Sequence, residues 1–330
     1  MLANLKKIFN PAAVAQALQP MPPLKSTVMD TFFTNRPAHP MAVIGLSELH
    51  RVIETVPVVR RDGAPVALGG EDFETQFFAP LPIKVKIAVT ASELNDLRVI
   101  MNDATAVAAW RSAKLEQIRR TIRLTTEAFC STVLTTGSLT WPKQLEGGRR
   151  ETYSIDYGDP LTHTLGTKLA ADSKISDVYD LLIIMEEKIQ MAGVGGSADF
   201  WCGKDVFKAL MDMVQGYRST ADQRMIKVEL GAGWISIGGY VIHVLNETYP
   251  DPEGQWVPKL NTKTLMAVAK DVPGTIWYCA LDSISANLAA LPMHIVPIQS
   301  LDDSSLTLIA QSKPVPVRPP KATCLCVAVA

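Results

Sequence analysis

The chain has 330 residues, of which 47% are apolar and 20% are charged, and its formal net charge is −1. This composition excludes a wholly disordered protein, and the near-zero charge excludes a general attraction of the whole molecule to nucleic acid or to a membrane surface. Five sparsely spaced cysteines predict no disulfide framework and favour a reducing compartment. No apolar run approaches the roughly 20 residues that a membrane-spanning helix needs.

The first 61 residues predict an extended basic arm. Six prolines lie within residues 1–40, and proline interrupts regular structure, so we expect an extended course with one or two short helices. Seven lysines and arginines and three acids give residues 1–61 a local net charge of +4. Such an arm is either a solvated tail or a segment that contacts an acidic partner or packaged nucleic acid.

The stretch "APLPIKVKIAVT" (79–90) predicts a strand with one apolar face. Alternation places on that face Leu81, Ile83, Val85, Ile87 and Val89. Pro80 and Pro82 cannot donate to a sheet ladder, which predicts an edge strand. Because a two-stranded ribbon is marginal in water by itself, we expect the apolar face to lie against another surface.

Residues 104–136 predict a long helix, because they contain no proline or glycine and carry an apolar stripe at helical spacing. The stripe consists of Leu115, Ile118, Ile122, Phe129 and Val133. The helix would be about 50 Å long and would end at Gly137. Its other faces carry Arg111, Lys114, Arg119, Arg120 and Arg123, which favours a solvated face, or one that contacts nucleic acid or an acidic partner.

The rest of the chain mixes strands and helices, which predicts an α+β fold. A short helix is expected at 91–100, and a strand that ends in a turn at 152–160. A helix is expected at 176–193, with Ser176 as its N-cap and Gly193 as its stop. A strand and a helix follow within 198–213, and two strands surround a Gly238–Gly239 hairpin turn. Further strands are expected at 264–270, 275–283, 293–300 and 306–312 and at the C-terminus.

The sequence contains no pattern that points to catalysis, a metal site or a cofactor. None of the five histidines is spaced with another ligand as a metal site requires, and His243 is expected to be a structural strand residue. The C-x-C pair Cys324 and Cys326 lacks a second pair, so apolar packing explains it better than zinc. No nucleophile elbow or phosphate-binding loop is present. We therefore expect no catalytic, metal or cofactor-binding residues.

The order of these features resembles that of tailed-phage major capsid proteins of the lambda capsid protein E family, which have the Hong Kong 97 capsid fold. The resemblance covers almost the whole chain. It consists of the proline-broken arm, the glycine pair Gly69–Gly70 with Glu71 and Phe73 before "PLPIKV", and the long basic helix. It continues with "YSIDYG" and with the late passage "QSKPVPVRPPKATCLCVAV".

The resemblance implies five segments. Residues 1–55 would form the N-terminal arm and 56–90 an extended loop, the E-loop, which lies over a neighbouring subunit. Residues 91–179 would form the peripheral domain with its spine helix at 104–136. Residues 180–290 would form the axial domain, and the strands of 291–330 would return to the peripheral domain.

The resemblance also implies which residues contact other molecules. The inter-subunit contacts of the E-loop would be made by Arg60, Arg61, Gly69, Gly70, Phe73, Phe77, Ile83, Val85 and Ile87. A basic surface that faces inward would be formed by Lys6, Lys7, Arg119, Arg120 and Arg123. We expect aspartate at Ile83 or Ile87 to leave the subunit folded and to block shell formation.

The implied function is structural: a major capsid subunit that assembles into hexamers and pentamers of an icosahedral phage head around double-stranded DNA. The implied partners are copies of itself, a separate scaffolding protein, a portal, a decoration protein, and DNA bound without sequence specificity; no membrane partner is expected. No lysine lies between Val56 and Leu81, so covalent crosslinking through the E-loop is not expected. Assembly would occur in the cytoplasm of the host bacterium.

Two alternatives remain open at this point. The same fold is used by the shells of encapsulin-type nanocompartments. A different class of protein, an α+β enzyme whose site residues are dispersed along the chain, would form a small oligomer with a deep polar pocket.

Overall fold

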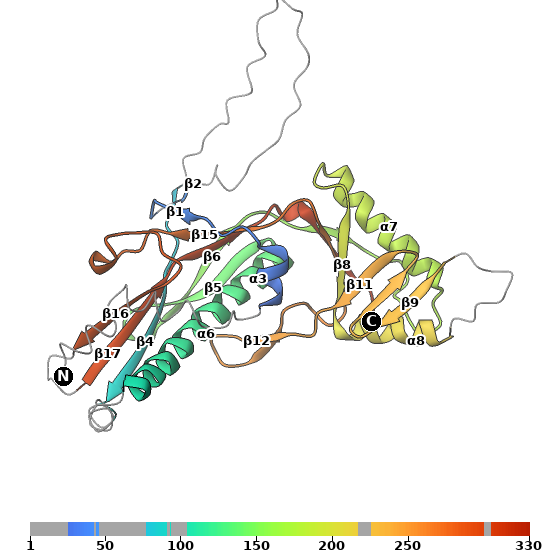
Figure 1. Cartoon of the computed structure of the whole chain (residues 1–330). Coiled ribbons are helices and arrows are strands. Elements are labelled where there is room, and N and C mark those ends of the chain that lie inside the picture. Colours follow the sequence, from blue (N-terminus) through green and yellow to red (C-terminus); the bar gives the residue numbers. More distant parts are fainter. Residues whose placement is uncertain are drawn as a thin grey trace, which may run out of the picture. The chain divides into compact units, whose positions relative to one another are not determined.

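The computed structural model describes residues 26–42, 44–45, 77–90, 93, 104–216, 226–299 and 305–330 (Figure 1). The chain is divided into two compact units. The first unit comprises Met1–Leu24, Arg36–Ile122 and Trp277–Val315, and the second comprises Lys25–Asn35, Arg123–Ile276 and Pro316–Ala330. Both helices and strands occur, as the α+β prediction requires.

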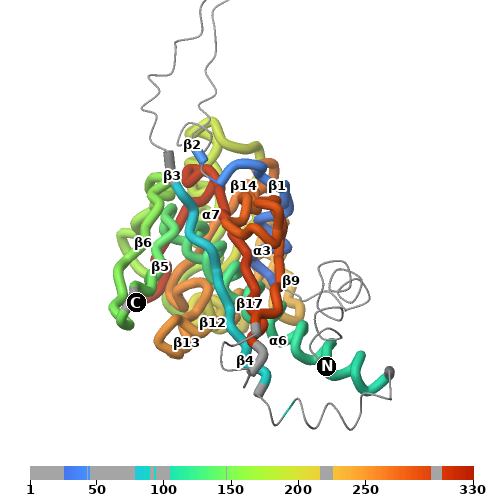
Figure 2. Tube along the Cα trace, turned by 90° about the vertical axis from the view of Figure 1, so that its left-hand side faces the viewer, coloured from blue at the N-terminus to red at the C-terminus, as the bar shows by residue number. Residues whose placement is uncertain are grey.

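The main sheet of the first unit has three antiparallel strands within the described residues. They are β16 (His294–Gln299), β17 (Ser305–Ser312) and β4 (Ile83–Thr90), in the order β16-β17-β4. Figure 2 shows β4 running beside β17, and their register pairs Ile87 with Leu308. Strand β4 lies at the edge of this sheet. Pro80 and Pro82, which precede it, predicted this edge position.

The core of the first unit explains where the apolar face of β4 lies. Helix α6 (Ala104–Thr136) contributes the buried residues Leu115, Ile118 and Ile122, and these cluster with Val89 and Leu308. The half-buried side chains of β4 that pack against the same cluster are Ile83, Val85 and Ile87. This apolar face therefore packs against a surface of its own chain, where Val89 is buried and the other three side chains are half-buried.

Helix α6 has the residues that the sequence predicted, and its 33 residues are almost three times the average helix length. Gly137 follows it with a φ of 69°, a left-handed conformation that favours glycine. A Cβ atom at this position would lie 1.9 Å from the carbonyl oxygen of Gly158, so space as well as backbone geometry requires glycine.

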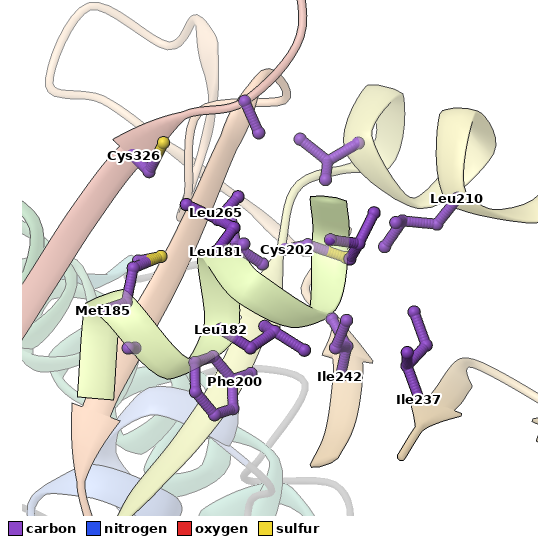
Figure 3. Packing of buried hydrophobic residues seen from close by; sticks show 14 of the residues in the cluster. Leu181, Leu182, Met185, Phe200, Cys202, Leu210, Ile237, Ile242, Leu265 and Cys326 are labelled. Carbon is purple, nitrogen blue, oxygen red and sulfur yellow. The ribbon is translucent and has the colours of Figure 1, made fainter. Parts of the chain in front are cut away.

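The largest sheet of the second unit has seven strands within the described residues, in the order β7-β19-β14-β8-β11-β10-β9. Their bounds are Leu161–His163 for β7, Thr323–Val327 for β19, Thr264–Ala269 for β14, Ala198–Cys202 for β8, Tyr240–Val244 for β11, Trp234–Ile237 for β10 and Val228–Gly231 for β9. Helices α7 (Ile175–Met191) and α8 (Lys204–Gly216) pack against it through apolar side chains. Figure 3 shows Leu181, Leu182 and Met185 of α7 among the side chains of the sheet.

The remaining elements are short. They are α3 (Thr27–Phe32), β1 (Ala38–His39), β2 (Ile44–Gly45), β3 (Phe77–Phe78), β5 (Ser138–Gln144), β6 (Arg150–Asp156), β12 (Thr248–Pro250), β13 (Trp256–Pro258), β15 (Thr275–Cys279) and β18 (Pro314–Val317). Three single-turn helices are also described, η1 (Glu146–Gly148), η2 (Ile284–Ala286) and η3 (Pro320–Ala322). Strands β5 and β6 pair as a hairpin, as do β12 and β13.

Most of the predicted elements are confirmed, with one local correction. The Gly238–Gly239 turn has φ angles of 60° and 98° and joins β10 to β11, as its sequence predicted. The N-cap of helix α7 lies two residues earlier than predicted: it is Lys174, and Ser176 lies inside the first turn. Of the predicted helix at 91–100, only Glu93 is among the described residues.

The C-terminal segment 291–330 is divided between the two units. Strands β16 and β17 belong to the first unit, whereas β19 pairs with β14 and β7 in the sheet of the second unit. Strand β19 therefore lies in a different unit from β16 and β17, and the return of 291–330 to the peripheral domain stays a prediction. Hydrogen bonding with β14, which is fully buried, explains the difference, because it places Cys324 and Cys326 in the core of the second unit.

Because β4 packs against α6, aspartate at Ile87 should lower the stability of the isolated subunit, and not only block shell formation. Ile87→Asp would place a carboxylate against the α6 cluster, so we expect it to lower the free energy of unfolding of the unassembled subunit by about 2–4 kcal/mol. Chemical denaturation of the subunit measures this change. The control is Ala88→Asp, at an exposed position on the opposite face; equal stability of the two variants would contradict the packing.

Candidate assembly surfaces

The described residues contain no group of three or more histidine, cysteine or acidic side chains that could hold a metal ion. Cys324 and Cys326 pack in the core of the second unit, as predicted, and burial raises the pKa of the Cys324 thiol to about 11. His243 stacks on Trp201 with ring centroids 5.0 Å apart, a structural contact. Within the described residues, helices of sufficient length lack the hydropathy of a membrane span.

A polar network of the second unit surrounds Glu127, a buried residue of α6 that is 1% exposed. Its carboxylate accepts hydrogen bonds of 2.8 Å from the backbone N–H groups of Val28 and Met29, at the start of α3. The ammonium group of Lys259 lies 2.6 Å from the same carboxylate and also contacts Glu247. Glu127 thus caps α3 from a position about a hundred residues away in sequence, where an anion complements the helix dipole.

Two arginines complete the attachment of α3. Arg123 forms hydrogen bonds to both carboxylate oxygens of Asp30, at 2.7 and 2.9 Å, and to the hydroxyl of Ser26. At the other end of α3, the buried Arg318 donates to the carbonyl oxygens of Phe32 and Ala269. Burial lowers the pKa of Arg318 to about 10, so it remains charged at neutral pH. We call residues 26–33 the anchor segment, because charges fix both of its ends.

The residues predicted to make E-loop contacts are only partly described. Arg60, Arg61, Gly69, Gly70 and Phe73 lie outside the described residues, as do Lys6 and Lys7 of the basic arm. Phe77 lies in β3, which pairs with β2. The contact of Ile83, Val85 and Ile87 with a neighbouring subunit stays a prediction, in addition to their packing within the chain.

Arg119, Arg120 and Arg123 of α6 are paired with acids of the same chain. Arg119 and Arg120 lie 3.6 and 2.8 Å from the carboxylate of Glu116, one turn earlier on the helix. Arg123 pairs with Asp30 of the anchor segment. These pairs offset much of the positive charge that the sequence assigned to this helix, and contact with DNA stays a prediction.

The β12–β13 hairpin of the second unit presents an aromatic side chain to solvent. Trp256 is 70% exposed and lies opposite Pro250. The turn is held by Asp251, whose carboxylate accepts the N–H groups of Glu253 and Gln255. Trp141 of β5 contacts Tyr249 of β12 and Phe129 of α6, and the ring centroids are 6.4 and 5.1 Å from its own. An ordered hairpin that exposes tryptophan is typical of protein contacts. The stretch "PDPEGQ" could have indicated its turn, which was not predicted from the sequence.

Several solved structures are similar to this chain. The crystal structure of the putative capsid protein of a prophage from E. coli CFT073 is similar over 96% of both chains, with a TM-score of 0.60 and 15% identity. A phage-related protein from Bordetella bronchiseptica RB50 matches 96% of this chain and 97% of its own, with a TM-score of 0.49 and 12% identity. The SrpI encapsulin of Synechococcus elongatus matches 86% of this chain and 94% of its own, with a TM-score of 0.40 and 11% identity. A comparison with curated protein sequences found no match.

The fold is therefore that of a Hong Kong 97-type phage capsid subunit, as the sequence resemblance predicted. The family model described as phage major capsid protein E matches residues 10–327. The chain belongs to this family, and it is a structural subunit of a phage capsid and a component of the virion.

The capping role of Glu127 leads to a stability prediction. Glu127→Ala would leave the ammonium of Lys259 and two N–H groups without their buried acceptor, so we expect a loss of about 3–5 kcal/mol in the free energy of unfolding. The matched control is Glu151→Ala, which removes an exposed ion pair with Lys143 and should cost less than about 1 kcal/mol. A loss for Glu127→Ala as small as that of the control would show that the network does not hold the anchor segment.

Glu247 leads to a pH prediction. Burial alone would raise its pKa, but hydrogen bonds from Lys259 and Thr27 and the charge of Lys259 outweigh burial, so its pKa is lowered in the folded chain. A lowered pKa adds stability above the ordinary value of 4.5, and this stability is lost as the pH falls through the folded pKa. Denaturation at pH 7 and pH 3.5 should therefore show a smaller loss of stability on acidification for Glu247→Gln than for the wild type. An identical loss would contradict the role of Glu247.

Proposed function

We propose that the chain is the major capsid subunit that forms the hexamers and pentamers of an icosahedral phage head and encloses double-stranded DNA. The observation that carries the proposal is the family match over residues 10–327, together with the capsid fold over nearly the whole chain. A fold of this kind supports a structural role, and the subunit would act without catalysis or a cofactor. Because the matching family is one of phage capsids, the capsid proposal is favoured over the encapsulin alternative.

The two units supply a domain assignment that rests on this proposal. The first unit, with its three-stranded sheet and the first half of α6, would be the peripheral domain. The second unit, with its seven-stranded sheet, would be the axial domain, packed around the five-fold and six-fold axes. The anchor segment would hold the N-terminal arm at a fixed position on the second unit, so that the basic arm leaves each subunit from the same place.

The proposed partners follow from the same role. Subunits would contact one another first, and a separate scaffolding protein, a portal and a decoration protein would act during and after assembly in the host cytoplasm. DNA would be contacted by sequence-independent interactions of basic residues with phosphates, which include Lys6 and Lys7 of the arm. Since no lysine lies between Val56 and Leu81, the shell would be held without covalent crosslinks through the E-loop.

Negative-stain microscopy of the purified protein, expressed alone and with the neighbouring genes of its phage, tests the proposal. We expect closed shells or sheets of hexamers and pentamers. Particles boiled in SDS should give one band at the subunit mass of 35.9 kDa, because no covalent links are expected. A uniform small oligomer under every condition would contradict the proposed function, and a ladder of larger bands would contradict only the absence of crosslinks.

A further inference from the structure

The connection between β15 and β16 in the first unit exposes two large aliphatic side chains. We call residues 280–292 the apolar loop; its single-turn helix η2 spans Ile284–Ala286. Ile284 is 92% exposed and Leu288 is 61% exposed. From Ser283 to Pro292 the loop contains no charged residue. An uncharged stretch with two exposed aliphatic residues is unusual on a solvated surface, where charged side chains are common.

The backbone of the apolar loop is strained at the point where Leu288 is exposed. Asn287 and Leu288 have φ angles of 53° and 54°, and they are the non-glycine residues with positive φ among those that the structure describes. Asparagine tolerates this left-handed conformation, but leucine does so at a cost, because its Cβ approaches the backbone. Strain of this kind persists where the surrounding structure imposes it, and it is concentrated at functional positions.

Hydrogen bonds hold the apolar loop in this conformation. The N–H of Leu288 donates to the carbonyl of Ser283 at 3.2 Å, and the N–H of Leu281 donates to the carbonyl of Ala289 at 3.2 Å. The hydroxyl of Ser285 lies 3.1 Å from the Nε2 atom of His294, a buried residue of β16. The exposure of Ile284 and Leu288 is thus a property of a fixed conformation.

The base of the loop is also attached to the unit. Lys313, which is 2% exposed, places its ammonium group 3.0 Å from the carboxylate of Asp282 and 3.4 Å from the carbonyl of Ala280. Ala280 in turn forms a bridge with Ala290, which closes the loop. A rigid loop loses little conformational entropy when it binds, so its exposed side chains are suited to form a contact.

We propose that the apolar loop docks onto a second copy of this chain, with Ile284 and Leu288 buried in the contact. The inference rests on the proposed function, since a capsid subunit meets many copies of itself. The chemistry of the loop favours this occupant: its exposed stretch 283–292 has no cationic group for DNA phosphates and no charge that would repel an identical subunit. Burial in the shell would also explain why the chain retains a strained leucine that is exposed in the isolated subunit.

Leu288→Gly tests the inference, because its two expected effects have opposite directions. Glycine relieves the strain of the positive φ, so the melting temperature of the unassembled subunit should rise or stay the same. Loss of the leucine side chain should raise the subunit concentration needed for assembly about tenfold, as measured by light scattering and sedimentation. The matched control is Asn287→Gly, which relaxes the neighbouring position but keeps Leu288, and its assembly should equal that of the wild type.

Position 284 gives a second test that does not depend on backbone strain. Ile284→Ser should weaken assembly and Ile284→Val should preserve it, with unchanged melting temperatures for both, because the side chain is almost fully exposed in the subunit. A photo-crosslinking amino acid at position 284 should capture another copy of the same chain in assembled particles, which mass spectrometry of the crosslinked peptide identifies.

The outcomes separate this inference from the proposed function. If the wild type forms shells but Leu288→Gly and Ile284→Ser assemble at the wild-type concentration, the inference is wrong and the capsid function stands. Capture of a different virion protein at position 284 would also overturn it, since the loop would then bind another partner. If the wild type forms no shell under any condition, the proposed function fails and the inference, which depends on it, fails as well.

Discussion

The apolar stripe of helix α6 is the constraint on which the rest of the subunit depends. A helix of 33 residues that carries buried side chains along its length must be covered along its length, and in water the uncovered stripe would favour aggregation. In the first unit, the cover comes from β4 and β17, which are separated by more than 200 residues in sequence and meet in one sheet. In the second unit, Phe129, Val133 and Leu134 of the same helix are buried.

In the second unit, helix α6 also makes a specific polar contact, the buried ion pair of its residue Glu127 with Lys259. An ion pair at this depth contributes little net stability compared with apolar packing, but its geometry admits few alternatives. Both oxygens of Glu127 are used by the anchor segment, and Lys259 is shared with Glu247. The pair therefore specifies where residues 26–33 lie more than it adds to the stability of the core.

The sequence predicted those elements whose signals are local. Helix α6 could be identified because no proline or glycine interrupts it, and the β10–β11 hairpin because two glycines mark its turn. Strand β5 was missed because Pro142 interrupts its pattern, and β12 and β13 because each has three residues, too few for a periodicity. The prediction for β4 identified its apolar face but not the surface that it covers, because no local signal indicates packing of a strand on helix α6. Its partner strand β17 also lies far away in sequence.

The features that carry the functional proposals were harder to predict. Glu127 caps a helix that begins about a hundred residues earlier, and no local sequence motif indicates such a contact. The strain at Leu288 depends on backbone angles that the stretch "SISANLAALP" does not indicate. The assignment to a capsid family, in contrast, was possible from the sequence because the order of arm, ribbon and helix extends over almost the whole chain, and the family match over residues 10–327 confirms it.

The subunit covers its own long helix with β4 before it meets a neighbour. Hydrogen–deuterium exchange of the unassembled subunit and of the assembled particle tests this claim most directly. We expect the amides of residues 83–90 that bond to β17 to be protected in both states. The amides of the apolar loop should become more protected on assembly. Rapid exchange of β4 in the unassembled subunit, followed by protection only in the particle, would contradict the claim and show that a neighbouring subunit is needed to complete this core.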